Sequence, residues 1–134
     1  MKRSDINTAL KARLATGGTG LSGTWPNVDP QGPVSRPFFE VQFPAQNRNG
    51  DYLSADVVRE TGSMAVIVVV SGGTGEDAAN DYAEAVSDLF PQSLRIAFTN
   101  GEITIEQPVD IRGGFRDGPD WRVPVIVQYS ALAS

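Results

Sequence analysis

The sequence predicts an α+β domain, with a mainly antiparallel mixed sheet of about five or more strands and two helices packed on it. Three patterns lead to this expectation. The run from Met64 to Val70 is apolar throughout, which is typical of a strand buried on both faces. Helical periodicity is found near the N-terminus and again directly after this strand. Finally, Asn100-Gly101 lies between two alternating segments, which indicates a tight β-hairpin.

Length and composition fit a single globular domain spanning residues 1–134. Of the 134 residues, 40% are hydrophobic and 20% are charged, ordinary values for a globular fold. The longest apolar run, Ala65–Val70, is far too short to cross a bilayer. No apolar stretch follows the basic residues at the N-terminus, so we expect neither a secretory signal nor a membrane partner.

The chain contains no cysteine and no histidine. It therefore lacks disulfides, zinc sites of the usual ligand types, thiol nucleophiles and a histidine general base. We expect no enzyme activity and no cofactor, because only carboxylates, two lysines and the tyrosines remain for acid–base work. Nine of the eleven cationic residues are arginine, which suits interfaces, although codon usage in a GC-rich genome would explain it equally well.

Two helices are expected, and a long connecting segment follows the first. Residues Ser4–Ala15 carry apolar side chains at helical spacing, with Ser4 as the expected N-cap. From about Glu76 to Phe90 an apolar stripe opposes an acidic surface, and a proline ends the pattern. Residues 17–37 are rich in Gly, Pro, Ser and Thr. We expect them to form an ordered arm anchored by Trp25, since a tryptophan is seldom left solvated without a use.

Strands are expected on either side of a polar segment. Phe38–Phe43 alternates apolar and polar residues, as a half-buried strand does. The polar residues 44–53, which include an Asn-Gly pair, are expected to be an exposed long loop. A second strand is expected over Ala55–Glu60. A short turn at Thr61-Gly62-Ser63 is expected to separate it from the buried central strand.

The β-hairpin is expected to close through Asn100-Gly101 as a two-residue type I′ turn. This register places Phe98 opposite Ile103 on one face. On the other face it places Arg95 opposite Glu106, a favourable cross-strand pair.

Two further segments complete the expected sheet. Val109–Asp120 contains paired glycines and is expected to be an irregular strand that ends in a loop. Trp121–Ser130 alternates and is expected to be the last strand, at a sheet edge because Pro124 cannot donate a backbone hydrogen bond. With two helices for five or more strands, one sheet face is expected to lack intramolecular cover, which favours oligomerisation.

The glycine loop after the central strand has the outline of a dinucleotide-binding turn. In that motif, backbone amides and the positive end of a helix face the pyrophosphate. Here Glu76 and Asp77 would repel the phosphates, no second βαβ unit follows, and no Walker Lys-Ser or Lys-Thr is present. A tight turn that leads into a helix therefore explains Gly72–Gly75 better than nucleotide binding does.

Three aspartates could be imagined as a metal site or an acid pair, namely Asp110, Asp117 and Asp120. Their spacing matches no calcium loop, and the last two belong to a stretch with the composition of a surface turn. We therefore expect no metal site.

Candidates for contact with a neighbouring subunit come from three places. The Gly/Pro-rich arm and the expected loop at 44–53 are longer than a minimal domain needs, although ordinary loop variation would also explain them. The arginines close to the aspartates suit either solvated ion pairs or a cluster that faces another subunit or DNA. The candidates are Trp25, Arg48, Asn49, Asp51, Tyr52, Arg112, Arg116 and Arg122.

The order of elements also resembles a known family. A helix precedes Trp25-Pro26-Asn27-Val28, and a proline-rich link leads to the strand Pro37-Phe38-Phe39-Glu40-Val41-Gln42-Phe43. The central strand breaks at Gly72-Gly73-Thr74-Gly75 into a helix that ends Asp88-Leu89-Phe90-Pro91. The chain closes with Trp121-Arg122-Val123-Pro124-Val125. Over nearly its whole length the sequence resembles the tail terminator proteins of long-tailed, siphovirus-type bacteriophages and prophages.

The resemblance implies a structural role in a virion, with no catalytic residues. Members of the family assemble as a ring, typically a hexamer, on the end of the tail tube. The ring stops polymerisation of the tube protein and offers a surface to the neck or head-completion protein. DNA passes through its lumen without sequence-specific binding, which the net charge of −5 would suit. The implied place is the head-proximal end of the tail, after assembly in the host cytoplasm.

Other functions stay open at this point. Within the same virion, the alternative is a head–tail connector or neck completion protein. From a different class, the alternatives are a small nucleotide-binding or hydrolytic enzyme that uses Gly72–Gly75, and a generic ligand-binding module.

Overall fold

The computed structural model describes residues 2–26, 35–51, 54–73 and 75–133, and for residues 49–51 and 54–58 it describes the backbone alone. The helices in these residues are α1 (Arg3–Thr16) and α2 (Asp77–Asp88). The strands are β1 (Ser22–Thr24), β2 (Phe38–Asp51), β3 (Ser54–Ser71), β4 (Arg95–Phe98), β5 (Gly101–Thr104), β6 (Asp110–Ile111), β7 (Phe115–Asp117) and β8 (Asp120–Ala133).

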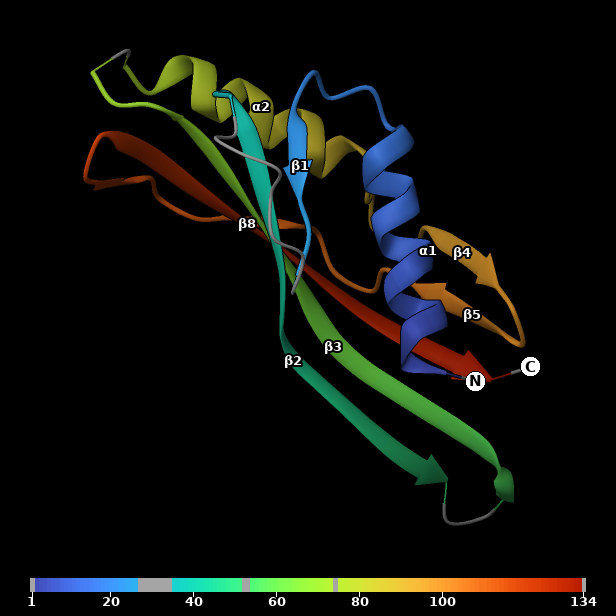
Figure 1. Cartoon of the computed structure of the whole chain (residues 1–134). Helices are drawn as coiled ribbons and strands as arrows, with labels where there is room; N and C mark the ends of the chain where they lie inside the picture. Colours follow the sequence, from blue (N-terminus) through green and yellow to red (C-terminus); the bar gives the residue numbers. More distant parts are fainter. Residues whose placement is uncertain (1, 27–34, 52–53, 74, 134) are drawn as a thin grey trace.

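One mixed sheet contains all eight of these strands, in the order β1-β2-β3-β8-β5-β4, while β6 and β7 also pair with β8. β1 runs parallel to β2, and the other pairings are antiparallel. The long, strongly twisted strands β2, β3 and β8 form the centre of the molecule (Figure 1). The expected α+β fold, a mainly antiparallel mixed sheet with two helices, is confirmed.

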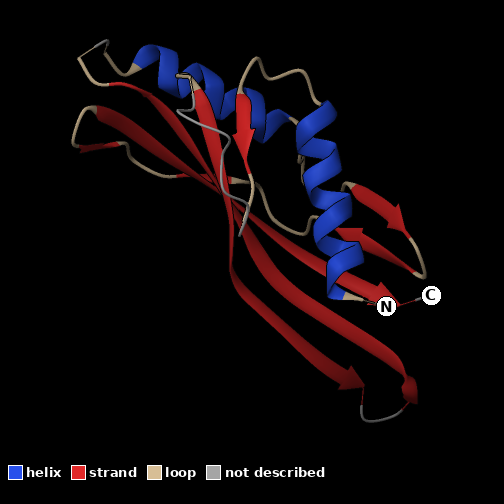
Figure 2. Ribbon diagram, viewed as in Figure 1, coloured by secondary structure: helices blue, strands red, loops and turns tan. Residues whose placement is uncertain are grey.

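The core lies between one face of the sheet and the two helices (Figure 2). Alternate residues of β3, among them Met64, Val66 and Val68, point to this face and are fully buried. α1 contributes Leu10 together with the apolar residues one turn to either side of it, and α2 contributes an alanine-lined face that ends near Val86. The period of two along β3 and the helical period along α1 and α2 thus meet in one apolar cluster.

β2 and β3 are longer than the sequence indicated. The expected loop at residues 44–53 is wrong as far as Asp51, because β2 continues through it, and residues 52–53 lie outside the described part. The expected turn at Thr61-Gly62-Ser63 is also wrong, because these residues pair with β2 on one side and with β8 on the other. The segments are polar because one of their faces is open to solvent, and a polar strand of this kind resembles a loop in sequence.

Gly62 is a strand residue for reasons of space and not of turn geometry. A Cβ atom on Gly62 would lie 2.8 Å from the hydroxyl oxygen of Tyr129 and nearer still to the carbonyl oxygen of Ala45. Glycine inside a strand commonly marks such a close approach.

The hairpin of β4 and β5 exists, but its register differs from the expected one. Phe98 pairs with Gly101, so the two-residue loop is Thr99-Asn100, and Asn100 has a φ of 64°. Asparagine tolerates this left-handed conformation. Ile103 therefore lies opposite Ile96 and not opposite Phe98.

The cross-strand ion pair of this hairpin changes with the register. Arg95 lies opposite Thr104 and not opposite Glu106. Its guanidinium is 3.8 Å from the carboxylate of Glu102 instead. Both side chains are largely exposed, so this ion pair contributes little to stability.

β8 is a central strand, so the edge position expected from Pro124 is wrong. β3 pairs with β8 from Asp120 to Leu132, while β5, β6 and β7 share the opposite side of β8. Pro124 lies opposite the break between β6 and β7. Its carbonyl oxygen accepts from the Arg112 amide at 2.9 Å on that side. The missing amide hydrogen of proline therefore costs no ladder hydrogen bond.

Both helices lie where the sequence placed them, within a few residues. The expected N-cap is wrong, because α1 begins at Arg3, one residue before Ser4, and Lys2 occupies the N-cap position without a side-chain hydrogen bond.

We predict that Leu10→Ala lowers the free energy of unfolding by about 2–5 kcal/mol, because it leaves a cavity where α1 meets the sheet. Chemical denaturation followed by circular dichroism measures the change. Thr8→Ala, on the exposed side of the same helix, is the matched control and should differ by less than about 0.5 kcal/mol. Equal losses in the two variants would show that α1 does not pack as described.

Candidate assembly surface

The hairpin formed by β2 and β3 extends beyond the rest of the sheet (Figure 1). β8 pairs with β3 only as far as Arg59, whereas β2 and β3 stay paired to Asp51 and Ser54. At about 3.3 Å per residue, this ribbon reaches roughly 16 Å beyond Arg59. We call residues 49–51 and 54–58 the projecting hairpin. In the described part of the chain, no further strand pairs with either of its edges.

A buried carboxylate lies at the root of the projecting hairpin. The side chain of Glu60 has no exposed surface, and its Oε1 accepts a hydrogen bond from Nε of Arg3 at 3.2 Å. Nη2 of Arg48 lies 3.3 Å from the same oxygen. A carboxylate taken out of water needs such partners, because an unpaired buried charge is strongly destabilising. The two arginines therefore tie β3 to α1 on one side and to β2 on the other.

Further polar contacts connect this root to the body of the protein. Nε2 of Gln46 donates to Oδ1 of Asn7 at 2.7 Å and to the hydroxyl oxygen of Tyr129 at 2.8 Å. Burial raises the pKa of the Tyr129 phenol, so its neutral form is favoured. α1, β2 and β8 thus all hold the base from which the projecting hairpin leaves.

A separate group of ion pairs lies at the opposite end of β8. The guanidinium of Arg122 is 2.9 Å from the carboxylate of Glu40 and 3.0 Å from that of Asp117. Arg36 donates from Nε to Oδ1 of Asp120, and this hydrogen bond lowers the pKa of Asp120. These contacts join β2, β7 and β8, so we interpret the group as a structural clamp.

The aspartates considered as metal ligands are partners of arginine. Asp117 and Asp120 both lie beside Arg122, and Asp110 is 3.2 Å from Arg112. Within the described ranges, no group of three or more possible ligands of the His, Cys, Asp or Glu type is placed to hold a metal ion.

The glycine loop after β3 is a tight turn. Gly73 and Gly75 have φ values of 86° and 84°, which favour glycine. A hollow of about 300 Å³ adjoins the loop and is lined on its other side by Arg116 and Trp121. Glu76 also lines it, at the start of α2, where its carboxylate would repel a phosphate. The arrangement is therefore better explained by a tight turn than by a nucleotide-binding site.

The interface candidates are distributed over the whole molecule. Arg48 lies at the root, and Asn49 and Asp51 are residues of the projecting hairpin. Tyr52 lies outside the described residues. That these residues contact a partner stays a prediction.

The other four candidates lie on the body. Trp25 packs edge-on against Phe39, with ring centroids 5.4 Å apart. Arg112 and Arg122 lie on the face of the sheet turned away from the helices, whereas Arg116 is opposite Trp121 on the helix face. The structure therefore does not gather the three arginines into one cluster.

Sequence reasoning missed the buried root. The strand expected over Ala55–Glu60 ends at Glu60, and Gln46 lies within the expected loop at residues 44–53. The available signal was the spacing of Arg48 and Glu60, which become opposite neighbours once a long hairpin is assumed. Assigning the polar stretch to a loop concealed that register.

Most of the chain matches a known protein family. The model of the phage tail terminator protein family matches residues 5–129. The chain belongs to this family. It is a structural protein of the phage tail, and the resemblance seen in the sequence is confirmed.

Solved structures with the same fold support the architecture of this tail terminator family member. One is 20% identical with a TM-score of 0.74, covering 98% of this chain and 96% of that one. Another belongs to the virion of a native gene transfer agent particle and is 15% identical with a TM-score of 0.66, at 98% and 96% coverage. At these identities the likeness shows the fold alone. A search of curated proteins gave no match.

Neither helix in the described part of the chain is both long and apolar enough to cross a bilayer.

We predict that replacing Arg3 and Arg48 together by alanine destabilises the protein by about 1–3 kcal/mol, because Glu60 is left buried without a counter-charge. The figure is modest because both arginines are partly solvated. Adding Glu60→Gln should restore part of the loss by removing the charge. Urea denaturation measures the stability of both variants. Arg95→Ala, which removes an exposed ion pair, is the control.

We predict a specific acid sensitivity from the Arg36–Asp120 contact. The hydrogen bond lowers the pKa of Asp120 from its ordinary 3.8, so folding favours the charged carboxylate. The stability gained is complete well above 3.8 and is lost as the pH falls through the lower folded value. Arg36→Gln should therefore make stability fall less steeply between neutral and acidic pH in a series of urea titrations. Parallel curves for the two proteins would contradict this assignment.

Proposed function

We propose that the protein is a tail terminator that forms a ring on the end of a phage tail tube through its projecting hairpin. The observation that carries the proposal is the ribbon itself. A two-stranded hairpin without further cover is marginally stable in water, yet here it extends well past the sheet on a braced root. A neighbouring copy that packs against this ribbon would supply the cover that it lacks.

The position of the projecting hairpin at one end of the molecule supports the proposed ring. A contact between the hairpin of one copy and a different surface of the next is heterologous, and heterologous contacts close into rings when the rotation between copies permits. We propose a hexamer, the number that the family resemblance implies. The proposed contact residues are Arg48 at the root, Asn49 and Asp51 of the projecting hairpin, and Tyr52, which follows them in the sequence. On the body they are Trp25, Arg112, Arg116 and Arg122.

The partners in this proposal are the tail tube protein on one side of the ring and a neck or head-completion protein on the other. DNA passes through the lumen without base-specific contacts, for which the net charge of −5 provides no general attraction. The protein is placed at the head-proximal end of the tail, after assembly in the host cytoplasm. The similarity to a protein in a gene transfer agent virion is consistent with a place in such a particle.

A shortened hairpin tests the proposal. Replacing residues 50–58 by Asn-Gly joins the paired residues Asn49 and Arg59 through a two-residue turn and leaves the root intact. We predict rings for the unaltered chain and monomers for the shortened one, by light scattering and negative-stain microscopy, with similar unfolding temperatures. Glu84→Gln, on the exposed side of α2, is the control and should still form rings.

The outcomes separate the parts of the proposal. An unaltered chain that stays monomeric at high concentration contradicts the ring, and full-size rings from the shortened chain contradict the role of the hairpin. Added to polymerising tube protein, the ring is expected to shorten the tubes and to cap one end. Binding without any change in tube length would indicate a neck completion protein instead.

A further inference from the structure

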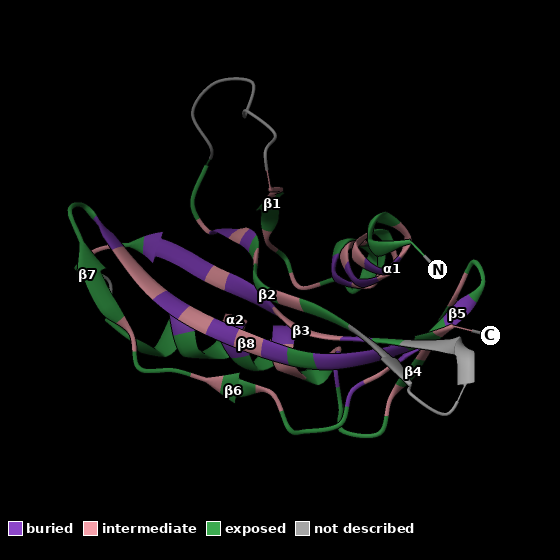
Figure 3. Ribbon diagram, turned by 90° about the horizontal axis from the view of Figure 1, so that it is seen from below, coloured by how far each residue is buried: buried purple, intermediate pink, exposed green. Residues whose placement is uncertain are grey.

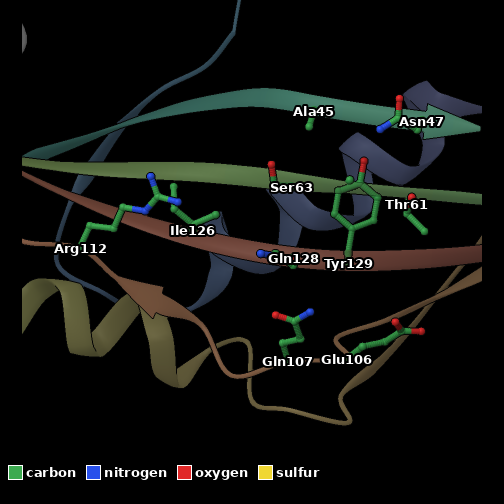
Figure 4. A pocket seen from close by; sticks show the side chains of 11 residues that line it. Ala45, Asn47, Thr61, Ser63, Glu106, Gln107, Arg112, Ile126, Gln128 and Tyr129 are labelled. Atoms are coloured by element: carbon green, nitrogen blue, oxygen red, sulfur yellow. The ribbon is translucent and has the colours of Figure 1, made fainter.

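The sheet carries a hollow on the face turned away from the helices, beside the root of the projecting hairpin (Figure 4). Its volume is about 470 Å³. Ala45, Thr61 and Ser63 of β2 and β3 line it, together with Ile126 and Gln128 of β8. None of these five residues belongs to the ion pairs of the root.

The shape and chemistry of the hollow suit a flat polypeptide ribbon. Its floor consists of short side chains, Ala45, Thr61 and Ser63 among them, whereas longer side chains stand at its rim, those of Gln107 and Arg112 included. Short side chains allow another backbone to approach more closely than the usual 10 Å or so between packed sheets. Sites for small molecules are mostly lined by apolar and aromatic side chains, whereas most of the residues that line this hollow are polar.

The projecting hairpin of a second copy is a ribbon of the right kind. Residues 49–58 carry two carboxylates, Asp51 and Asp56, and no cation. Arg112 at the rim has a side chain 62% exposed, and its ion pair with Asp110 is itself exposed and therefore easily exchanged. Because Glu106 also lines the hollow, charge would set the register of an incoming hairpin more than its affinity.

We propose that this hollow receives the projecting hairpin of the neighbouring copy. The proposal rests on the ring proposed above and specifies its contact. The hollow and the hairpin are two different patches of the same chain, so each copy inserts its hairpin into the next copy and accepts one from the copy before. This is a head-to-tail contact that can close. Among the described residues, no strand other than β2 and β3 pairs along the projecting hairpin, so its backbone edges are open to a neighbour.

Engineered cysteines test the contact cleanly, because the chain has none of its own. One chain carries Ser54→Cys in the projecting hairpin, and another carries Gln128→Cys in the hollow. Mixed and treated with a short thiol-to-thiol crosslinker, they should give a covalent dimer about tenfold more abundant than the control mixture, because assembly raises the effective concentration of the two thiols. The control pairs Ser54→Cys with Glu84→Cys on the exposed side of α2. A single chain carrying both Ser54→Cys and Gln128→Cys should give a ladder of larger products.

A second measurement does not depend on crosslinking. Ser63→Trp fills the hollow but leaves the projecting hairpin intact, whereas the Asn-Gly variant keeps the hollow but lacks the hairpin. Each alone should be monomeric, and their mixture should give a discrete heterodimer with a single working contact. Rings from Ser63→Trp alone would overturn the proposal.

The results also distinguish this inference from the proposed function. Rings that form while the Ser54–Gln128 crosslink stays at the control level overturn the contact and leave the ring standing. A chain that never assembles contradicts both. Crosslinking of Gln128→Cys to the tube protein, and not to a second copy, would show that the hollow has a different occupant and would overturn the proposal.

Discussion

The pairing of β3 with two long neighbours at once is the constraint on which the rest of the structure depends. β3 is paired with β2 on one side and with β8 on the other from Arg59 to Val69, interrupted on the β2 side by one bulge. A shift of one residue in either ladder would turn every side chain to the opposite face. This double register therefore decides which residues of β3 meet the helices. It also places Glu60 beside Arg48 and brings the short side chains of the hollow to the outer face. Along much of β8, buried residues alternate with less buried ones (Figure 3).

The unequal lengths of these strands make the hairpin project. β8 ends at Ala133, while β2 and β3 continue as a ribbon of two strands. Glu60 is near the last position at which β3 has neighbours on both sides, and there its carboxylate is paired with arginines from α1 and β2. Leaving a buried carboxylate unpaired would be costly, so these contacts favour the arrangement that holds α1 and β2 against β3 at the point where the support of the sheet ends. A braced ribbon loses less conformational entropy when a neighbour binds it.

The sequence was most informative where burial imposed a period. The apolar run from Met64, the amphipathic pattern of α2 and the order of elements that identified the family all reflect contact with one core. It was misleading where residues face solvent, because a polar strand and a loop have the same composition. The β4–β5 register was missed by two residues, a shift that keeps every side chain on its face, so facing patterns alone could not detect it. The Arg3–Glu60 contact and the hollow depend on segments far apart in the sequence, which no local pattern encodes.

On the side of β8 away from β3, the break in pairing between β6 and β7 connects Pro124 with the proposed contact. Because Pro124 has no amide hydrogen, a continuous partner strand would gain no bond at that position, and the chain instead crosses from β6 to β7 there. The amide of Arg112 binds the carbonyl oxygen of Pro124 at this crossing, which fixes the backbone from which the Arg112 side chain reaches the rim of the hollow. Pro124, which suggested an edge strand, thus lies in a central strand. On one side of that strand the pairing is interrupted between β6 and β7.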